Sequence, residues 1–142
     1  MKYTPAARLA LFGIVALGSA CVSASRDLPP PTSGWRYLGE GTSIRAFYQR
    51  AARNPSSEYQ SWIRFDYLSG GSTRDGRPLE SEVTHVRIDC TRRQIQPLRH
   101  YLYAARNAEG PYRVEGPSPA PPDVVPGTIY ADLFAIWCRS RT

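Results

Sequence analysis

Residues 59–67 read Tyr-Gln-Ser-Trp-Ile-Arg-Phe-Asp-Tyr and alternate between two sets of side chains. The first set is Tyr59, Ser61, Ile63, Phe65 and Tyr67, and the second is Gln60, Trp62, Arg64 and Asp66. A period of two is typical of a β-strand that buries one of its faces. Because Ile63 and Phe65 are apolar, we expect the first set to lie under a covering element. The second set is then expected to face outward, with Trp62 beside Arg64 and Asp66.

The same period recurs on both sides of this stretch. The predicted strands are residues 35–38, 43–50, 59–67, 83–90 and 94–106. A turn signal, Asn-Pro-Ser-Ser at 54–57, lies between two of these strands, and a polar loop is expected at 69–78. Pro97 is expected to break the last strand, and residues 112–114 are expected to pair briefly. Short strands in sequence with hairpin turns indicate an antiparallel meander.

The C-terminal part changes to a helical period. Pro126-Gly127-Thr128 precedes it, and Thr128 is a suitable N-cap residue. Ile129, Leu133 and either Ile136 or Trp137 then form an apolar stripe. The predicted fold is therefore α+β: an antiparallel sheet of about five or six strands in a meander, with a C-terminal helix packed on one face.

The first 24 residues are typical of an export signal. Lys2 and Arg8 accompany an apolar run at residues 9–17, which is shorter than the about 20 residues that span a bilayer. Two kinds of processing fit the residues that follow. Small residues at 22–24 suit a cut after Ala24, whereas Leu-Gly-Ser-Ala-Cys is similar to a lipobox that ends in lipidation of Cys21. The expected location is the periplasm or the outer membrane, with the cell surface included and with a lipid anchor if Cys21 is acylated.

Three consecutive prolines lie in residues 25–34 and predict an extended, semi-rigid linker. The expected organisation is a signal peptide at 1–24, this linker at 25–34 and one domain at 35–142. Loss of the signal peptide lowers the number of basic residues from 18 to 16, all arginine, against 12 acidic residues. This modest surplus specifies no electrostatic partner, and an exported protein is not expected to bind nucleic acid.

Cys90 and Cys138 are the two cysteines that remain after the signal peptide. In an oxidising compartment a disulfide is the favoured interpretation, and a metal site or a reactive thiol is the alternative. Metal sites usually place Cys or His ligands at short spacing, and neither His85 nor His100 lies in such a motif. No metal and no cofactor is therefore predicted.

No constellation of nucleophile, base and orienting carboxylate is evident in the sequence. His85 alternates onto one face with Arg87 and Asp89, which suits a solvated or hydrogen-bonded sheet face. Gly70-Gly71 is not followed by the Gly-Lys-Ser/Thr of a phosphate-binding loop. We therefore predict no catalytic residue and no enzyme activity.

Several short motifs together carry a resemblance to a known family. They are Trp35 at the domain start, Ser43-Ile44, the Trp62 strand, Asp89-Cys90-Thr91-Arg92-Arg93, Tyr101 with Tyr103, and a Pro-Gly-Thr helix start before Cys138. In this order the residues resemble the surface-adhesin protein E-like proteins of proteobacteria, from Trp35 to Cys138. The resemblance implies an antiparallel sheet under one helix, a Cys90–Cys138 disulfide and often a lipid anchor. It also implies adhesion to host matrix for some members.

The aromatic content favours a binding module, because Tyr, Trp and Arg are the usual anchors of protein interfaces. We predict that Trp62, Arg64 and Asp66 form an exposed patch that docks a protein partner or a second copy of the chain. The alternative is that the aromatic rings serve mainly to pack the sheet under the helix. Two functions follow: an adhesin-like module that binds host or neighbouring macromolecules, or an accessory or structural subunit of an envelope assembly.

Overall fold

The structure is a computed structural model that describes residues 28–53, 59–117 and 124–139. Cys21, the signal peptide and the turn predicted at 54–57 lie outside these residues. The elements are β1 (Arg36–Glu40), β2 (Ile44–Tyr48), β3 (Ala52–Arg53), β4 (Tyr59–Ser72), β5 (Pro78–Asp89), β6 (Gln94–Tyr103), η1 (Arg106–Ala108), β7 (Tyr112–Glu115) and α1 (Ile129–Arg139). In the described part of the chain, no helix has the length and apolar character needed to cross a membrane.

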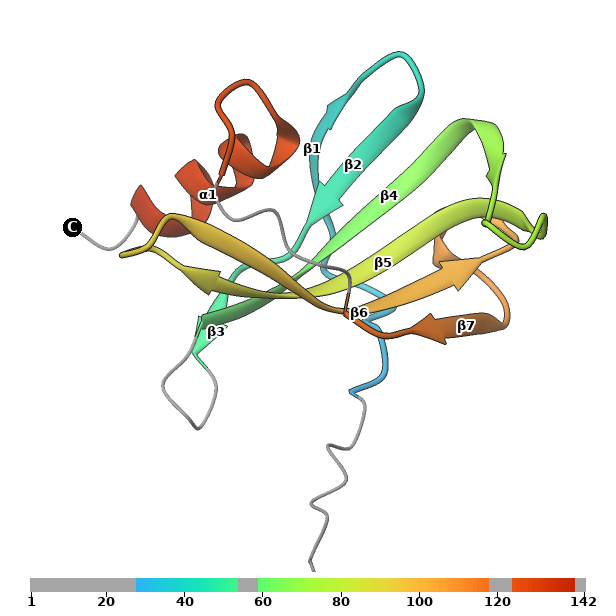
Figure 1. Cartoon of the computed structure of the whole chain (residues 1–142), viewed down its shortest axis with the longest axis horizontal. Coiled ribbons are helices and arrows are strands. Elements are labelled where there is room, and N and C mark those ends of the chain that lie inside the picture. Colours follow the sequence, from blue (N-terminus) through green and yellow to red (C-terminus); the bar gives the residue numbers. More distant parts are fainter. Residues whose placement is uncertain (1–27, 54–58, 118–123, 140–142) are drawn as a thin grey trace, which may run out of the picture.

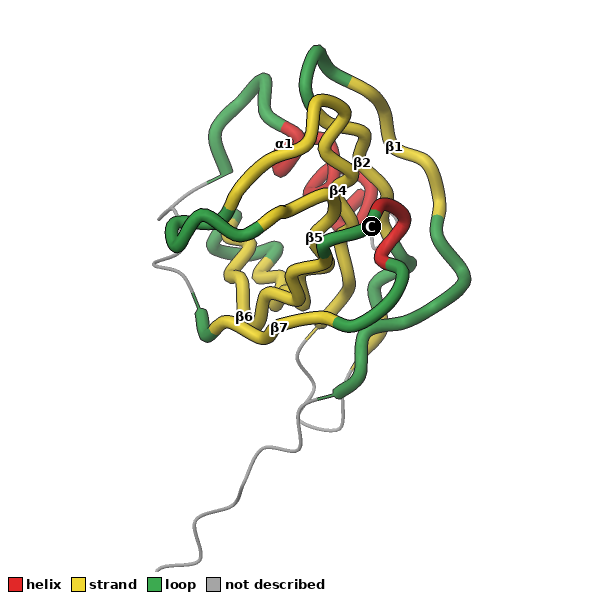
Figure 2. The backbone as a smooth tube through the Cα atoms, turned by 90° about the vertical axis from the view of Figure 1, so that its right-hand side faces the viewer, coloured by secondary structure: helices red, strands yellow, loops and turns green. Residues whose placement is uncertain are grey.

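The strands form one strongly twisted sheet in the order β1-β2-β4-β5-β6-β7, in which β3 pairs with β4 (Figure 1). Every strand pairing is antiparallel. In both backbone views α1 and β7 lie toward opposite ends of the molecule (Figures 1 and 2). The predicted α+β meander with a C-terminal helix is confirmed.

The hairpin between β4 and β5 is longer than the sequence predicted. The polar loop expected at 69–78 is shorter, because β4 continues to Ser72 and β5 begins at Pro78. The ladder is interrupted after Asp66 and resumes at Gly71, and Gly70 between them has a φ of +67°. Glycine adopts this left-handed conformation without strain. The polar stretch can therefore pair with β5 again after the interruption, and it remains part of the sheet.

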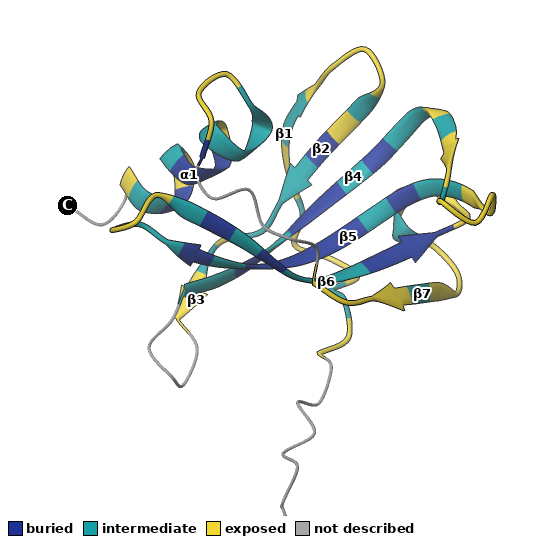
Figure 3. Cartoon of the chain, viewed as in Figure 1, coloured by how far each residue is buried: buried dark blue, intermediate teal, exposed yellow. Residues whose placement is uncertain are grey.

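The main core lies between α1 and one face of the sheet, as the alternation of β4 predicted. Its buried members are Ile63, Val86, Ile88, Ile95, Val124, Leu133, Phe134 and Trp137. Figure 3 shows buried stretches on α1 and along β4, β5 and β6. The helix starts where expected, since the Thr128 side-chain oxygen accepts a hydrogen bond from the backbone N–H of Ala131 at 3.3 Å. Trp137 completes the apolar stripe, whereas Ile136 is 39% exposed.

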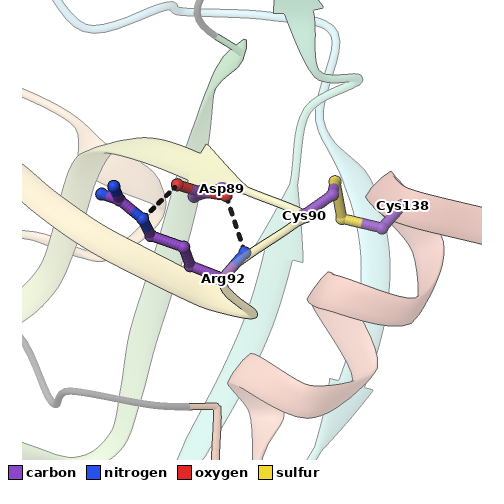
Figure 4. Close-up of a disulfide and its surroundings, with 4 residues drawn as sticks. All are labelled: Asp89, Cys90, Arg92 and Cys138. Atoms are coloured by element: carbon purple, nitrogen blue, oxygen red, sulfur yellow. Dashed lines mark hydrogen bonds and ion pairs between the residues drawn. A yellow bond between two sulfur atoms is a disulfide. The ribbon is translucent and has the colours of Figure 1, made fainter.

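A disulfide joins Cys90, directly after β5, to Cys138 in the last turn of α1 (Figure 4). The two Cα atoms are 5.7 Å apart, a usual separation for a disulfide. Beside it, the backbone N–H of Arg92 donates to the Asp89 carboxylate at 2.9 Å and closes the turn between β5 and β6. The expected disulfide is confirmed, and it fastens the helix to the sheet that the helix covers.

Candidate functional site

The second face of β4 is where the sequence placed a binding patch. Trp62 lies away from α1, in a cluster that contains Val83, Tyr101 and Tyr103, so its predicted direction is confirmed. The predicted exposure is wrong: Arg64 is 9% exposed, Asp66 is 4% exposed, and Trp62 is half-buried.

This face is buried because distant parts of the chain cover it. Trp35, just before β1, and Ala108 of η1 both pack against the cluster of Val83, Tyr101 and Tyr103. The alternation of β4 separates its two faces but carries no information about these covering segments. The sheet therefore has a second, aromatic core on the side opposite α1.

Trp62 packs tightly within this second core. Its ring stacks on His85 with centroids 4.3 Å apart and an interplanar angle of 18°, and it lies 5.7 Å from the Tyr101 ring. Burial lowers the pKa of His85 below its ordinary value of 6.5. His85 was expected on a solvated or hydrogen-bonded face, but it is 8% exposed and serves as a stacking partner.

Arg64 is held between two aromatic rings. Its guanidinium carbon lies 3.9 Å from the centroid of Phe47 and 5.4 Å from that of Trp35, within cation–π range. One guanidinium nitrogen lies 3.3 Å from a carboxylate oxygen of Asp66. Within the described residues, Arg64 Nε and Asp66 Oδ1 are buried without a hydrogen-bond partner. The pair is thus fixed by its surroundings and retains unused hydrogen-bonding capacity.

A cleft of about 600 Å³ opens in front of Arg64. Its lining residues are Pro29, Pro30, Pro31, Thr32, Trp35, Arg64, Tyr103, Asn107, Ala108, Glu109, Gly110 and Tyr112. We refer to it as the Arg64 cleft. Its volume lies within the range of ligand-binding clefts. Of the three residues predicted to bind a partner, Arg64 lines the cleft, whereas Trp62 and Asp66 are not among its lining residues.

The end of the proline-rich linker forms one wall of the Arg64 cleft. The Tyr101 hydroxyl donates a hydrogen bond to the backbone carbonyl of Leu28 at 2.7 Å. Residues 29–31 follow directly and line the cleft. The composition of the linker predicted its stiffness, but no pattern in the sequence indicated that it packs against the domain.

Another part of the lining of the Arg64 cleft is aromatic. The Tyr112 ring lies 5.3 Å from Tyr101 and 5.5 Å from Tyr103, and Tyr112 is 42% exposed. Burial, with smaller contributions from the neighbouring tyrosines, raises the pKa of Tyr103 to about 12. Its hydroxyl therefore stays protonated at physiological pH. The cleft thus offers a cation, aromatic faces and hydroxyl groups to a guest.

A buried polar cluster on the α1 side of the sheet was not predicted. Glu82 accepts hydrogen bonds from Thr84 at 2.8 Å and from Tyr67 at 2.9 Å, and its carboxylate lies 2.6 Å from His100 Nδ1. Thr84 Oγ1 lies 3.3 Å from the same ring nitrogen. A catalytic triad needs its nucleophile and its carboxylate on different ring nitrogens, so these contacts do not form a triad. The strand register, which brings Thr84 opposite His100, is the only signal that unites these residues.

The polar cluster and His85 predict a loss of stability in acid. Burial acts to raise the pKa of Glu82, but hydrogen bonds from His100 and Thr84 outweigh it and hold the pKa below its ordinary value of 4.5. A carboxyl whose pKa is lowered by folding stabilises the fold above its ordinary pKa, and this contribution is lost as the pH falls through the folded value. The lowered pKa of His85 acts in the same direction, starting below pH 6.5.

We expect the melting temperature to fall below pH 6.5 and more steeply below pH 4.5. Glu82→Gln should lower the melting temperature at pH 7 and flatten the profile below pH 4.5. Glu109→Gln, at an exposed position, is the matched control and should leave the profile unchanged. Circular dichroism melts between pH 8 and pH 3 measure both effects, and an unchanged slope in Glu82→Gln would contradict the assignment.

Among the described residues, no three or more His, Cys, Asp or Glu side chains form a group that could hold a metal ion. Two acidic residues whose side chains are largely buried instead contact basic side chains. Asp66 contacts Arg64, and Glu82 contacts His100.

A comparison with protein-family models matches residues 35–139 to a model described as Surface-adhesin protein E. The matched segment begins one residue before β1 and ends at the last residue of α1, so it includes every strand and helix described. No curated protein and no solved structure matches the chain.

Proposed function

Because the chain belongs to the surface-adhesin protein E family, we propose that it is an exported, non-catalytic module that binds a host or neighbouring macromolecule through the Arg64 cleft. The family supports a surface adhesin in general terms. The cleft is the specific feature that supports this choice of binding face.

The observation that carries the proposal is the immobilised guanidinium of Arg64 at an aromatic cleft. Trp, Tyr and Arg dominate the energetic centres of protein interfaces. Arg64 lies 3.9 Å from the Phe47 ring and close to Asp66, so little side-chain entropy remains to be lost on binding. A prearranged anchor of this kind is suited to a protein partner.

The three residues of the predicted patch then take different roles. Arg64 would contact the partner, Asp66 would hold Arg64 in position, and Trp62 would support the cleft from the second core. The contact surface would be completed by Trp35, Tyr103 and Tyr112. A second copy of the chain is one partner that this surface would accommodate.

We further propose that the mature chain is held at the outer membrane or released into the periplasm, according to how its N-terminus is processed. Acylation at Cys21 would supply a lipid anchor, and a cut after Ala24 would not. Mass spectrometry of the mature N-terminus distinguishes a diacylglyceryl group on Cys21 from a free Ser25.

We expect Tyr112→Ala to weaken partner binding by about tenfold, because an aromatic hot-spot residue commonly contributes about 1.4 kcal/mol or more. Its loss of stability should be small, since Tyr112 is 42% exposed. Tyr37→Ala is the matched control, because Tyr37 is 58% exposed and does not line the Arg64 cleft. Binding of purified variants to immobilised matrix proteins, together with sedimentation for self-association, provides the measurement.

Protease treatment of intact cells tests the location that an adhesin requires. Digestion of the domain without permeabilisation would support the adhesin function. Protection until the outer membrane is opened would instead support the accessory or structural subunit of an envelope assembly. Equal binding by wild type, Tyr112→Ala and Tyr37→Ala would contradict the choice of the Arg64 cleft in either case.

A further inference from the structure

A second pocket, of about 480 Å³, lies on the α1 side of the sheet and shares no lining residue with the Arg64 cleft. It is lined by Arg36, Tyr48, Arg50, Ala51, Tyr59, Ile136 and Trp137. We refer to it as the Arg36–Arg50 pocket. The residues come from β1, β2, the segment after β2, β4 and the end of α1.

The pocket arises where the edge of the sheet is interrupted. β2 ends at Tyr48 and β3 begins at Ala52, and both strands pair with β4. The backbone of Gln49, between them, makes three hydrogen bonds. Its N–H donates to the Trp62 carbonyl at 3.0 Å, and its own carbonyl accepts from Ser61 Oγ at 2.8 Å and from Trp137 Nε1 at 2.9 Å. The rigid break therefore leaves a space beside Arg50 that the end of α1 borders.

Two arginines line the Arg36–Arg50 pocket, and none of its described lining residues is acidic. Arg36 and Arg50 are both exposed, and no Asp or Glu is among the residues that line the pocket. Elsewhere in the molecule arginines contact carboxylates, as Arg45 does with Glu40 at 2.7 Å and Arg106 with Glu80 at 3.2 Å. Two guanidinium groups at one concave site favour an anionic guest.

The other lining residues indicate which further groups the ligand should have. Ala51 and Ile136 present apolar surface, and Ile136 is 39% exposed although it belongs to the helix that covers the core. A bare phosphate would use the arginines but not this apolar wall. Arg36 also lies on β1, the edge strand of the sheet, where an extended segment can add alongside.

We propose that the Arg36–Arg50 pocket binds an acidic peptide segment of a partner protein. A Glu or Asp carboxylate lies between the two guanidinium groups, where forked, charge-assisted hydrogen bonds form. A neighbouring apolar side chain of the peptide packs on Ile136. This site goes beyond the Arg64 cleft and involves none of its lining residues.

The test uses the disulfide-bonded chain from residue 25 to residue 142, labelled with ¹⁵N. The probe is the capped peptide acetyl-Phe-Glu-Glu-Phe-amide, and its uncharged match is acetyl-Phe-Gln-Gln-Phe-amide. The Trp137 indole N–H and the backbone amide of Ala51 are the reporters, because both residues line the pocket. We expect saturable shifts with the Glu peptide and about tenfold weaker binding of the Gln peptide.

Arg36→Gln/Arg50→Gln should weaken binding of the Glu peptide by at least about tenfold, since charge-assisted hydrogen bonds to both guanidinium groups are lost. Arg74→Gln/Arg92→Gln removes the same charge at exposed positions outside the pocket and should bind as wild type does. Equal loss in both double variants would show a general charge effect and overturn the proposal.

Three further results would also overturn it: equal binding of the Glu and Gln peptides, absence of shifts at millimolar peptide, or a stronger response to inorganic phosphate. A separate experiment adds vesicles of anionic lipid to the complex with the Glu peptide. If the vesicles bind the pocket more strongly than the peptide does and displace it, the pocket would be assigned to a membrane surface instead. Because Tyr112 does not line this pocket, Tyr112→Ala should leave peptide binding unchanged. Failure of this proposal is therefore distinguishable from failure of the Arg64 cleft.

Discussion

Removal of the Cys90–Cys138 disulfide is expected to lower the free energy of unfolding by about 4 kcal/mol in the chain-entropy model. The two cysteines are 48 residues apart, so the bond closes a long loop in the unfolded chain. In the native state it fastens α1 over Ile63 and Val86, which are both 0% exposed. Stabilities of small domains are commonly 5–15 kcal/mol, so the loss is a large share of the total.

Urea denaturation of wild type, with and without reductant, and of Cys90→Ser/Cys138→Ser measures this effect. The reduced wild type and the double variant should unfold at the same urea concentration, and reductant should not affect the double variant. A double variant as stable as the oxidised wild type would contradict the prediction. Stoichiometric titration of free thiols in the purified protein would show that the bond is absent.

Arg64→Met is expected to destabilise the protein by about 3–5 kcal/mol, because it leaves the buried Asp66 carboxylate without its cation. The same substitution removes the guanidinium from between the Phe47 and Trp35 rings. Asp66 is 4% exposed, so water cannot replace the lost partner at low cost. This is a larger effect than an exposed Arg on an open sheet face would give.

The double variant Arg64→Met/Asp66→Asn provides the control for this prediction. Its loss of unfolding free energy should be smaller than the sum of the losses in the two single variants. The reason is that each single variant leaves one buried charge unpaired, whereas the double variant has removed both charges. Arg77→Met, at an exposed ion pair with Asp75, should cost less than about 1 kcal/mol. A loss of that small size for Arg64→Met would show that water reaches the pair freely.

The expected cost of changing Arg64 affects how its binding role is tested. A loss of binding in an Arg64 variant would combine partial unfolding with loss of a contact. Tyr112 lines the same cleft but is 42% exposed, so its replacement separates the two effects. Melting temperatures measured beside the binding data make that separation explicit.

Local periodicity determined much of the fold. The alternation at residues 59–67 placed Ile63 under the helix and Trp62 on the other face, and both placements are confirmed. The helical stripe ending at Trp137 and the pairing of Cys90 with Cys138 are also confirmed. These features depend on neighbours along the chain or on a single possible pairing, so sequence suffices for them.

Only the tertiary structure decided what covers each face. Period two separates the faces of β4, but the segments that cover its second face contain Trp35 and Ala108, which are distant from β4 in sequence. Residues 29–31 of the linker line the cleft because the preceding residue, Leu28, is hydrogen-bonded to Tyr101, 73 positions away in sequence. The cluster of Glu82 with His100 likewise required the register of β5 and β6.

The Arg36–Arg50 pocket has the same origin. Its two arginines are unremarkable in sequence, and they meet because the break between β2 and β3 places Arg50 near β1 and the end of α1. Local pattern thus indicated most of the strands, the helix and the main core, because those choices depend on side chains a few positions apart. Long-range packing alone decided the clefts, since a concave site is made by segments whose proximity only the folded chain creates.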